Sequence, residues 1–282
     1  MSDELNSRIR ADYSRVRFKA FLNGILASLS GRRNRLLSYD AVKEKLHLGG
    51  PIYRGVQTVR VDQIAGSLNR YHQFDHAFLP TQSDTSARWQ SVNRAFYQDV
   101  SLPPVVLYKV GQVYFVVDGH HRVSVAREQH QEFIDAEVRE VSSRVNITPD
   151  LQPEDLEILG DKVHFLERSA LDHLRPEANI KLTIPDGFDR MLEHIAVHRY
   201  FMGLDRKRDI SEPEAVMSWY DTVYMPIVEV IRSSGILKDF PGKTEGDLYL
   251  WVLDHQNYLF QEQGQPLQSP GDAARGFIDD QE

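Results

Sequence analysis

The chain has 282 residues, of which 41% are hydrophobic and 26% are charged, so it has the composition of a globular protein with one large or two ordinary domains. It contains no cysteine, which excludes disulfides, thiolate zinc sites and a cysteine nucleophile. The net charge is -8, although residues 8–35 carry eight basic side chains against Asp12 alone, so contacts with nucleic acid or anionic lipid must be local.

Residues 1–50 are predicted to form a basic, amphipathic helical extension. Large apolar side chains recur there at three- and four-residue spacing, which places them on one face of a helix over about 7–30. These residues are Phe18, Phe21, Leu22, Ile25, Leu26 and Leu29. We expect this face to pack on the body of the protein, and contact with a membrane surface or nucleic acid is the alternative. A second helix, from about Tyr39 to Leu46, ends before Gly49-Gly50-Pro51, the first domain boundary.

Residues 51–145 are predicted to form a mixed α/β domain in the order strand, helix, hairpin, helix, strand. Short alternating runs rich in β-branched residues indicate the strands, and apolar residues at helical spacing indicate the helices. The predicted strands are 57–61, 105–109, 113–117 and 134–139, and the predicted helices are 84–98 and 121–129. The second and third strands are joined at Gly111-Gln112, which favours a hairpin.

Residues 146–262 are predicted to form an α-helical domain, with breaks near Pro226 and Gly235 and a capped helix that begins after Thr244. Residues 263–282 are rich in Gly, Pro, Gln and Asp, so we expect a disordered tail. The predicted fold class is therefore α+β. No apolar run is long enough for a transmembrane segment and no signal peptide is evident, which leads us to expect a cytoplasmic protein.

The run Asp118-Gly119-His120-His121-Arg122 lies between a predicted strand and a predicted helix. A helix that opens there aims unpaired backbone amides and the positive end of its dipole at one point, where anions bind. Gly119 lets the backbone approach closely, and Arg122 offers a planar fork of donors for phosphate oxygens. His120 and His121 add donors, and Asp118 has two roles open to it, orienting Arg122 or holding Mg²⁺. A surface turn is the alternative interpretation.

The stretch 56–141, about a third of the chain, resembles the ParB/sulfiredoxin superfamily. The resemblance rests on Val59-Arg60-Val61-Asp62-Gln63-Ile64, on Leu102-Pro103-Pro104-Val105-Val106-Leu107 and on the loop 118–122. The Asp-Gly-His-His-Arg form of the loop is most similar to that of the free-serine kinases of this superfamily. A histidine stands where sulfiredoxins have their catalytic cysteine, so sulfiredoxin chemistry is excluded.

The resemblance implies that Asp118, Gly119, His120, His121 and Arg122 hold the phosphates of ATP or ADP with Mg²⁺, without a resident metal site. It also implies a general base after the first strand, and in this sequence Asp75 occupies that place, with His121 as the second candidate catalytic residue. A loop or capping carboxylate is the alternative role for Asp75.

Two functions remain open from the sequence. The first is a nucleotide-dependent phosphotransferase that acts on a small hydroxyl metabolite. The second is a nucleotide-sensing regulatory or DNA-associated protein without turnover. DNA is possible as a partner but is not favoured, because no helix-turn-helix follows the α/β domain and the helical domain is acidic. The oligomeric state is left open by the sequence.

Overall fold

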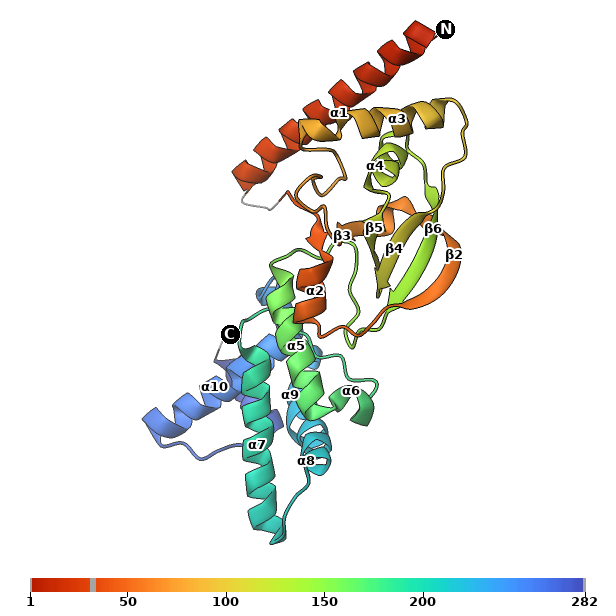
Figure 1. Cartoon of the computed structure of the whole chain (residues 1–282). Helices are drawn as coiled ribbons and strands as arrows, with labels where there is room; N and C mark the ends of the chain where they lie inside the picture. The colour runs from red at the N-terminus through yellow and green to blue at the C-terminus, as the bar shows by residue number, and fades with distance from the viewer. Residues whose placement is uncertain (1, 31–33, 281–282) are drawn as a thin grey trace. The chain divides into compact units, whose positions relative to one another are not determined.

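The computed structural model describes residues 2–30 and 34–280, and it divides into two compact units, Met1–Leu156 and Glu157–Glu282 (Figure 1). The division falls after Leu156, later in the chain than the boundary that the sequence predicts at residue 145. The first unit is mixed α/β and the second is α-helical, as the sequence predicts. In the part of the chain that is described, no helix is both long and apolar enough to cross a bilayer.

The first unit is built on a six-stranded mixed sheet with the strand order β1-β3-β5-β4-β6-β2. The strands are β1 (Leu37–Ser38), β2 (Ile52–Arg60), β3 (Ile64–Ser67), β4 (Val105–Val110), β5 (Val113–Asp118) and β6 (Phe133–Val141). β4 and β5 form the predicted antiparallel hairpin, whereas β3 lies parallel to β5 and β4 lies parallel to β6. The parallel pairing of β3 with β5 brings the ends of both strands to the same edge of the sheet.

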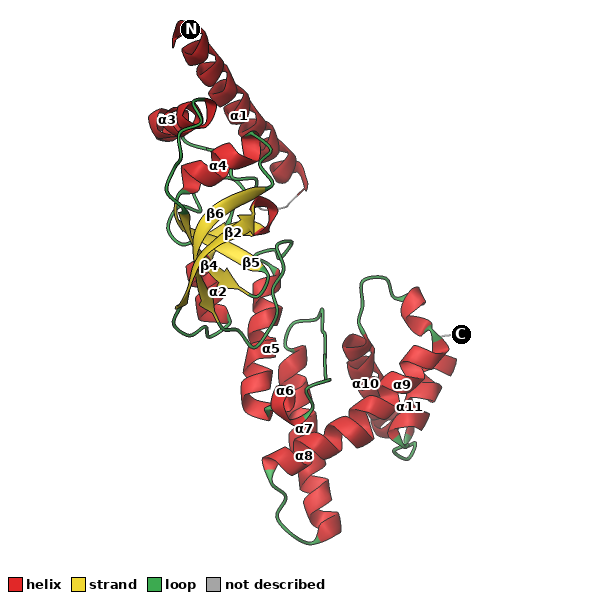
Figure 2. Ribbon diagram, turned by 90° about the vertical axis from the view of Figure 1, so that its right-hand side faces the viewer, coloured by secondary structure: helices red, strands yellow, loops and turns green. Residues whose placement is uncertain are grey.

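The described part of the first unit also contains the α-helices α1 (Ser2–Ser30), α2 (Tyr39–Lys45), α3 (Ser86–Tyr97) and α4 (His120–Glu128). α4 lies between the sheet and the helices α1 and α3 (Figures 1 and 2). Its buried Val123 belongs to the core of the sheet, while Val125 packs in a second cluster with Trp89 of α3 and Val16 of α1. The α4 helix is therefore fixed on both sides, which sets the position of its first turn.

The face of α1 that packs on the unit is not the face predicted from the sequence. Ile9 and Val16 are fully buried and Ala20 is 5% exposed. The six large apolar residues between Phe18 and Leu29 are exposed instead, by between 42% and 80%. The predicted packing of this apolar face is therefore wrong, because the opposite face of the same helix is buried, and its Val16 and Ala20 pack in one cluster with Trp89 of α3.

The second unit contains only helices in the described residues: α5 (Asp155–Ser169), α6 (Leu171–Leu174), α7 (Gly187–Arg206), α8 (Glu212–Trp219), α9 (Met225–Ser234), α10 (Glu245–Gln263) and α11 (Pro270–Asp279). A π-helical turn, Tyr220–Tyr224, joins α8 to α9 just before Pro226, which cannot donate a backbone hydrogen bond. At the centre, the Trp219 indole donates to the Tyr249 hydroxyl (3.0 Å), which lies 3.1 Å from Nδ1 of His194.

The prediction that the tail 263–282 is disordered is wrong for half of its length. Residues Pro270–Asp279 form α11, which packs against α9 and α10. The Ser269 side chain accepts a hydrogen bond from the Asp272 amide and so caps this helix, and Pro270 suits its first turn. Ala273, Ala274 and Phe277 are buried, so a small apolar face holds a helix in a segment whose average composition is polar.

Candidate functional site

The turn between β5 and α4 has a conformation that requires glycine. Gly119 has φ +102°, in the left-handed region that side chains strain. A Cβ at this position would also lie 2.6 Å from Cγ1 of Val105 and 3.0 Å from the Arg122 guanidinium. Because Gly119 offers no side-chain cap, the amides in the first turn of α4 are left for another acceptor. The local sequence therefore builds an uncapped helix N-terminus at the edge of the sheet.

Arg122 holds this turn in place. Its guanidinium donates to the Asp118 carboxylate (Nη2 to Oδ2, 2.6 Å), to the Pro104 carbonyl (2.8 Å) and to the Pro103 carbonyl. The side chain is only 15% exposed. Three of its five N–H donors are therefore used within the protein, and the planar fork expected to face phosphate is partly occupied by Asp118 and two backbone carbonyls.

The two histidines of the loop are buried and uncharged at neutral pH. Nε2 of His120 lies 2.8 Å from the Ser67 hydroxyl at the end of β3, and its ring stacks on Phe74. Nδ1 of His121 is buried and has no hydrogen-bond partner among the described residues. Burial first, and then the positive charge of Arg70, lower the pKa of each imidazole to about 4. Both rings can therefore accept or donate one hydrogen bond without carrying charge.

A cavity of about 680 Å³ opens over the first turn of α4. It is lined by Arg70, Ala87, Arg88, Ser91, Val92, Leu102, Pro103, Asp118, Gly119, His120, His121 and Arg122. Arg70 has only a long hydrogen bond to Gln73 (3.4 Å), and in the described residues neither Arg70 nor Arg88 forms an ion pair. The positive charge of both lowers the pKa of His121, as expected for cations close to this ring. Two arginines thus face the helix N-terminus without a carboxylate partner.

Asp75 does not line this cavity. It is fully buried and its carboxylate accepts hydrogen bonds from the amides of Ala77 (3.0 Å) and Leu79 (2.8 Å) and from the Asn23 side chain (3.0 Å). These donors bind the carboxylate oxygens and stabilise a tight turn. Because the carboxylate is fully buried and outside the cavity, it is not placed to deprotonate a substrate there. The role of general base is not supported for Asp75 by its position.

The structure adds two residues that the sequence analysis does not single out. Arg70 follows β3 and Arg88 lies in the first turns of α3, more than 25 residues before the loop 118–122. The signal available in the sequence is the position of each arginine inside the predicted α/β domain. Asp84, whose charge raises the pKa of His121, is the exposed carboxylate that lies near this ring. It is not among the residues that line the cavity.

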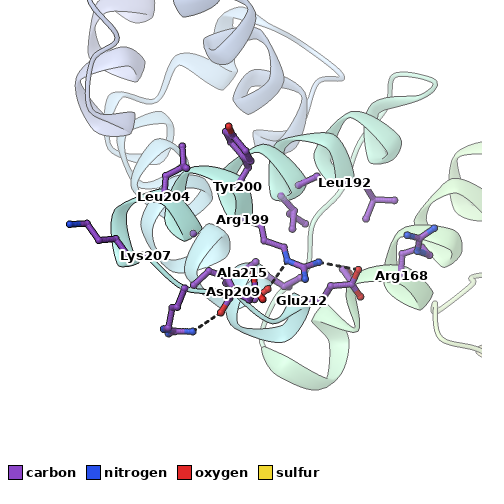
Figure 3. A pocket seen from close by; sticks show the side chains of 16 residues that line it. Arg168, Leu192, Arg199, Tyr200, Leu204, Lys207, Asp209, Glu212 and Ala215 are labelled. Atoms are coloured by element: carbon purple, nitrogen blue, oxygen red, sulfur yellow. Dashed lines mark hydrogen bonds and ion pairs between the residues drawn. The ribbon is translucent and has the colours of Figure 1, made fainter.

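A larger cavity, of about 980 Å³, lies in the helical unit between α7 and α8 (Figure 3). Its central arginine, Arg199, donates to the Ile210 carbonyl (2.6 Å) and lies 3.6 Å from the Glu212 carboxylate. Arg208 donates to Glu214, with one of its contacts at 3.0 Å. Arg199 and Arg208 are thus used to join the C-terminal end of α7 to α8, whereas Arg168 and Lys207 of the same cavity form no ion pair with the described residues.

Neither unit contains a preformed metal centre within the residues described, because no three His, Asp or Glu side chains converge there. His194 and His198, which stand four residues apart on α7, bind different partners, since His194 contacts Tyr249 and His198 contacts Ser218 (2.9 Å).

No protein-family model and no curated protein matches the chain. Several solved structures are similar to it, including the following two. One is sulfiredoxin from Arabidopsis thaliana, which is 16% identical over 32% of this chain and 89% of that chain, with a TM-score of 0.25. The other is a Pnob8-like ParB-N domain, which is 10% identical over 82% of this chain and 98% of that chain, with a TM-score of 0.23. Both TM-scores are below 0.5, so no functional conclusion follows from these two likenesses.

Proposed function

We propose that the cavity over the first turn of α4 binds the phosphate groups of a nucleotide, ADP or ATP with its Mg²⁺. The observation that carries the proposal is the pair Arg70 and Arg88, which face an uncapped helix N-terminus without a carboxylate partner. Guanidinium groups and first-turn amides are both donors that match phosphate oxygens. The other arginine of the cavity, Arg122, keeps the loop in the conformation that exposes these amides.

Binding without turnover is the form of this function that the geometry favours. Phosphoryl transfer to a hydroxyl group needs a base within reach of the acceptor. Asp75 is buried in its own turn, and Asp118 is held by Arg122. With pKa values lowered to about 4, His120 and His121 are weak bases. We therefore propose a nucleotide-sensing protein, in which the bound phosphates change the equilibrium between conformations.

A phosphotransferase acting on a small hydroxyl metabolite is the second candidate, and one observation favours it. Asp84 is exposed and its charge raises the pKa of His121, so it is a carboxylate near the cavity that is not bound to an arginine in the described residues. Turnover that is lost in Asp84→Asn, while nucleotide affinity is kept, would support this candidate over the sensor.

The test is calorimetric titration of MgATP, MgADP and MgCTP into the wild-type protein and into Arg70→Ala and Arg88→Ala. Removing one charge-assisted contact to phosphate costs roughly 1.5–3 kcal/mol, so each variant should bind about 10- to 100-fold more weakly. Arg60→Ala is the matched control, because this exposed arginine pairs with Asp62 (2.6 Å) away from the cavity. Equal affinity in all three variants, or no binding to the wild type, would reject the proposal.

A further inference from the structure

The helix α1 has apolar residues on two opposite faces, and only one of them has a partner. Ile9, Val16 and Ala20 are buried against the first unit, as described above. With about 100° between successive residues of a helix, the six exposed apolar residues lie on the other side. They are Phe18, Phe21, Leu22, Ile25, Leu26 and Leu29. In both views α1 is the outermost helix of its unit (Figures 1 and 2).

The spacing of the exposed residues is that of a coiled-coil seam. Phe18, Leu22, Ile25 and Leu29 follow one another at intervals of four, three and four residues, as alternating a and d positions do. Phe21 and Leu26 flank this seam on either side. The seam spans roughly 17 Å of helix at about 1.5 Å per residue. A second helix is therefore the shape that fits this face.

The charges beside the seam argue against a lipid surface as the occupant. A helix that lies on an anionic membrane needs free lysine or arginine at the edges of its apolar face. Here Arg15 and Lys19 both bind Glu128, at 3.0 Å and 2.9 Å, and Arg17 donates to the Pro80 carbonyl at 3.0 Å. These contacts direct Arg15, Arg17 and Lys19, at the N-terminal end of the seam, toward the protein's own body.

We propose that the exposed face of α1 from Phe18 to Leu29 binds the same face of a second copy of this chain. The six side chains would remove roughly 600 Å² of mostly apolar surface per copy, given that an aromatic side chain alone buries about 150–250 Å². The total exceeds the roughly 1,000 Å² that a specific interface requires. The body of each copy packs on the far side of α1 and leaves the seam accessible.

The two possible orientations of the pair differ in which residues meet. A parallel pair sets Leu22 opposite Leu22 of the other copy and Ile25 opposite Ile25. An antiparallel pair centred between Leu22 and Ile25 sets Leu22 opposite Ile25 and Phe18 opposite Leu29. The seam from Phe18 to Leu29 is apolar in both orientations, so cross-linking distinguishes them.

The first experiment measures the mass of the full chain by sedimentation equilibrium. We expect a dimer for the wild type and at least a tenfold weaker dimer for Leu22→Glu and for Ile25→Glu, because a carboxylate would be desolvated in the seam. The matched control is Leu204→Glu, which changes a leucine that is 58% exposed on α7 and should leave the dimer intact. Circular dichroism checks that each variant keeps its helix content.

A second experiment uses the fact that the chain has no cysteine of its own. In an antiparallel dimer, an equimolar mixture of Leu22→Cys and Ile25→Cys chains should form an intermolecular disulfide faster than either variant alone. In a parallel dimer, Leu22→Cys should cross-link faster with itself. Cross-linking by either route supports the dimer, and its absence in both would count against it. A monomeric wild type would overturn the dimer itself. Sedimentation of the wild type, but not of Leu22→Glu, with anionic phospholipid vesicles would overturn it as well.

Discussion

The two cavities of this protein differ in what their arginines do. The larger one, between α7 and α8, has Arg199 bound to a backbone carbonyl and close to Glu212, and Arg208 bound to Glu214. The smaller one, over α4, has Arg70 and Arg88 without ion-pair partners in the described residues. In the first case Arg199 and Arg208 hold helices together, and in the second Arg70 and Arg88 remain available to an anion beside a helix N-terminus. The size of a cavity is thus a poorer guide to function than the partners of its charged residues.

Acid should affect the smaller cavity most strongly, because it contains two buried imidazoles and the larger cavity is lined by none in the described residues. The pKa of His120 and of His121 is about 4 in the folded protein against 6.5 when unfolded. The unfolded chain therefore binds more protons between these values. The contribution of the neutral imidazoles to the free energy of unfolding is fully present above pH 6.5, falls as the pH drops toward 4, and changes no further below that. The total loss is roughly 3 kcal/mol per imidazole.

The measurement is the unfolding midpoint by calorimetry between pH 7.5 and pH 4. The double variant His120→Gln/His121→Gln should flatten this pH dependence. Burial also lowers the pKa of His194 in the helical unit to about 4, so His194→Gln is the matched control and should flatten it about half as much. A wild-type midpoint that does not change over this range would contradict the assignment of neutral, buried rings.

The next largest effect should come from a methyl group added at position 119, which should disturb the smaller cavity and leave the larger one unchanged. Gly119→Ala places a side chain at φ +102° and drives a Cβ to 2.6 Å from Val105, so we expect a loss of roughly 3 kcal/mol in stability and no detectable nucleotide binding. Gly264→Ala is the control, since it has φ +67° with no atom within 4 Å and should cost about 1 kcal/mol. Chemical denaturation and calorimetric titration measure both effects. Unchanged binding in Gly119→Ala would show that the turn is not part of the site.

The smallest effect should come from the larger cavity. Arg199→Ala leaves the buried Ile210 carbonyl without its donor, which should cost about 1 kcal/mol of stability and leave nucleotide affinity unchanged. Arg168→Ala removes a cavity arginine for which the described residues supply no ion-pair partner, so its stability should stay within about 0.5 kcal/mol of the wild type. If Arg199→Ala weakened nucleotide binding, the division of roles between the two cavities would be wrong.

The sequence predicts local structure well where a short segment contains the whole signal. The hairpin of β4 and β5, the helix after Gly119 and the Thr244 capping box each depend on neighbouring residues, and all three are present. The order of strands in the sheet, by contrast, cannot be predicted from neighbouring residues. β1 has only two residues, Leu37–Ser38, so it carries no alternation that could reveal its pairing with β3.

Errors arise where a pattern fits two environments. Six large apolar residues dominate the sequence of α1, although the fewer and more widely spaced Ile9, Val16 and Ala20 make the packed face. Asp75 has the chemistry of a base, but its buried position depends on the fold of the turn around it. Arg70 and Arg88 reach the loop through the sheet topology and the packing of α3 on α4, which sequence spacing does not encode.

The hydrogen bonds that Arg122 makes to the turn affect the rate at which a ligand associates. Because its three hydrogen bonds tie the turn to Asp118 and to the segment before β4, the turn takes its shape during folding. The conformational entropy of ordering the turn is then lost once, before any ligand arrives. Association should accordingly be limited by diffusion and electrostatic steering toward Arg70 and Arg88, with no slow rearrangement of the loop.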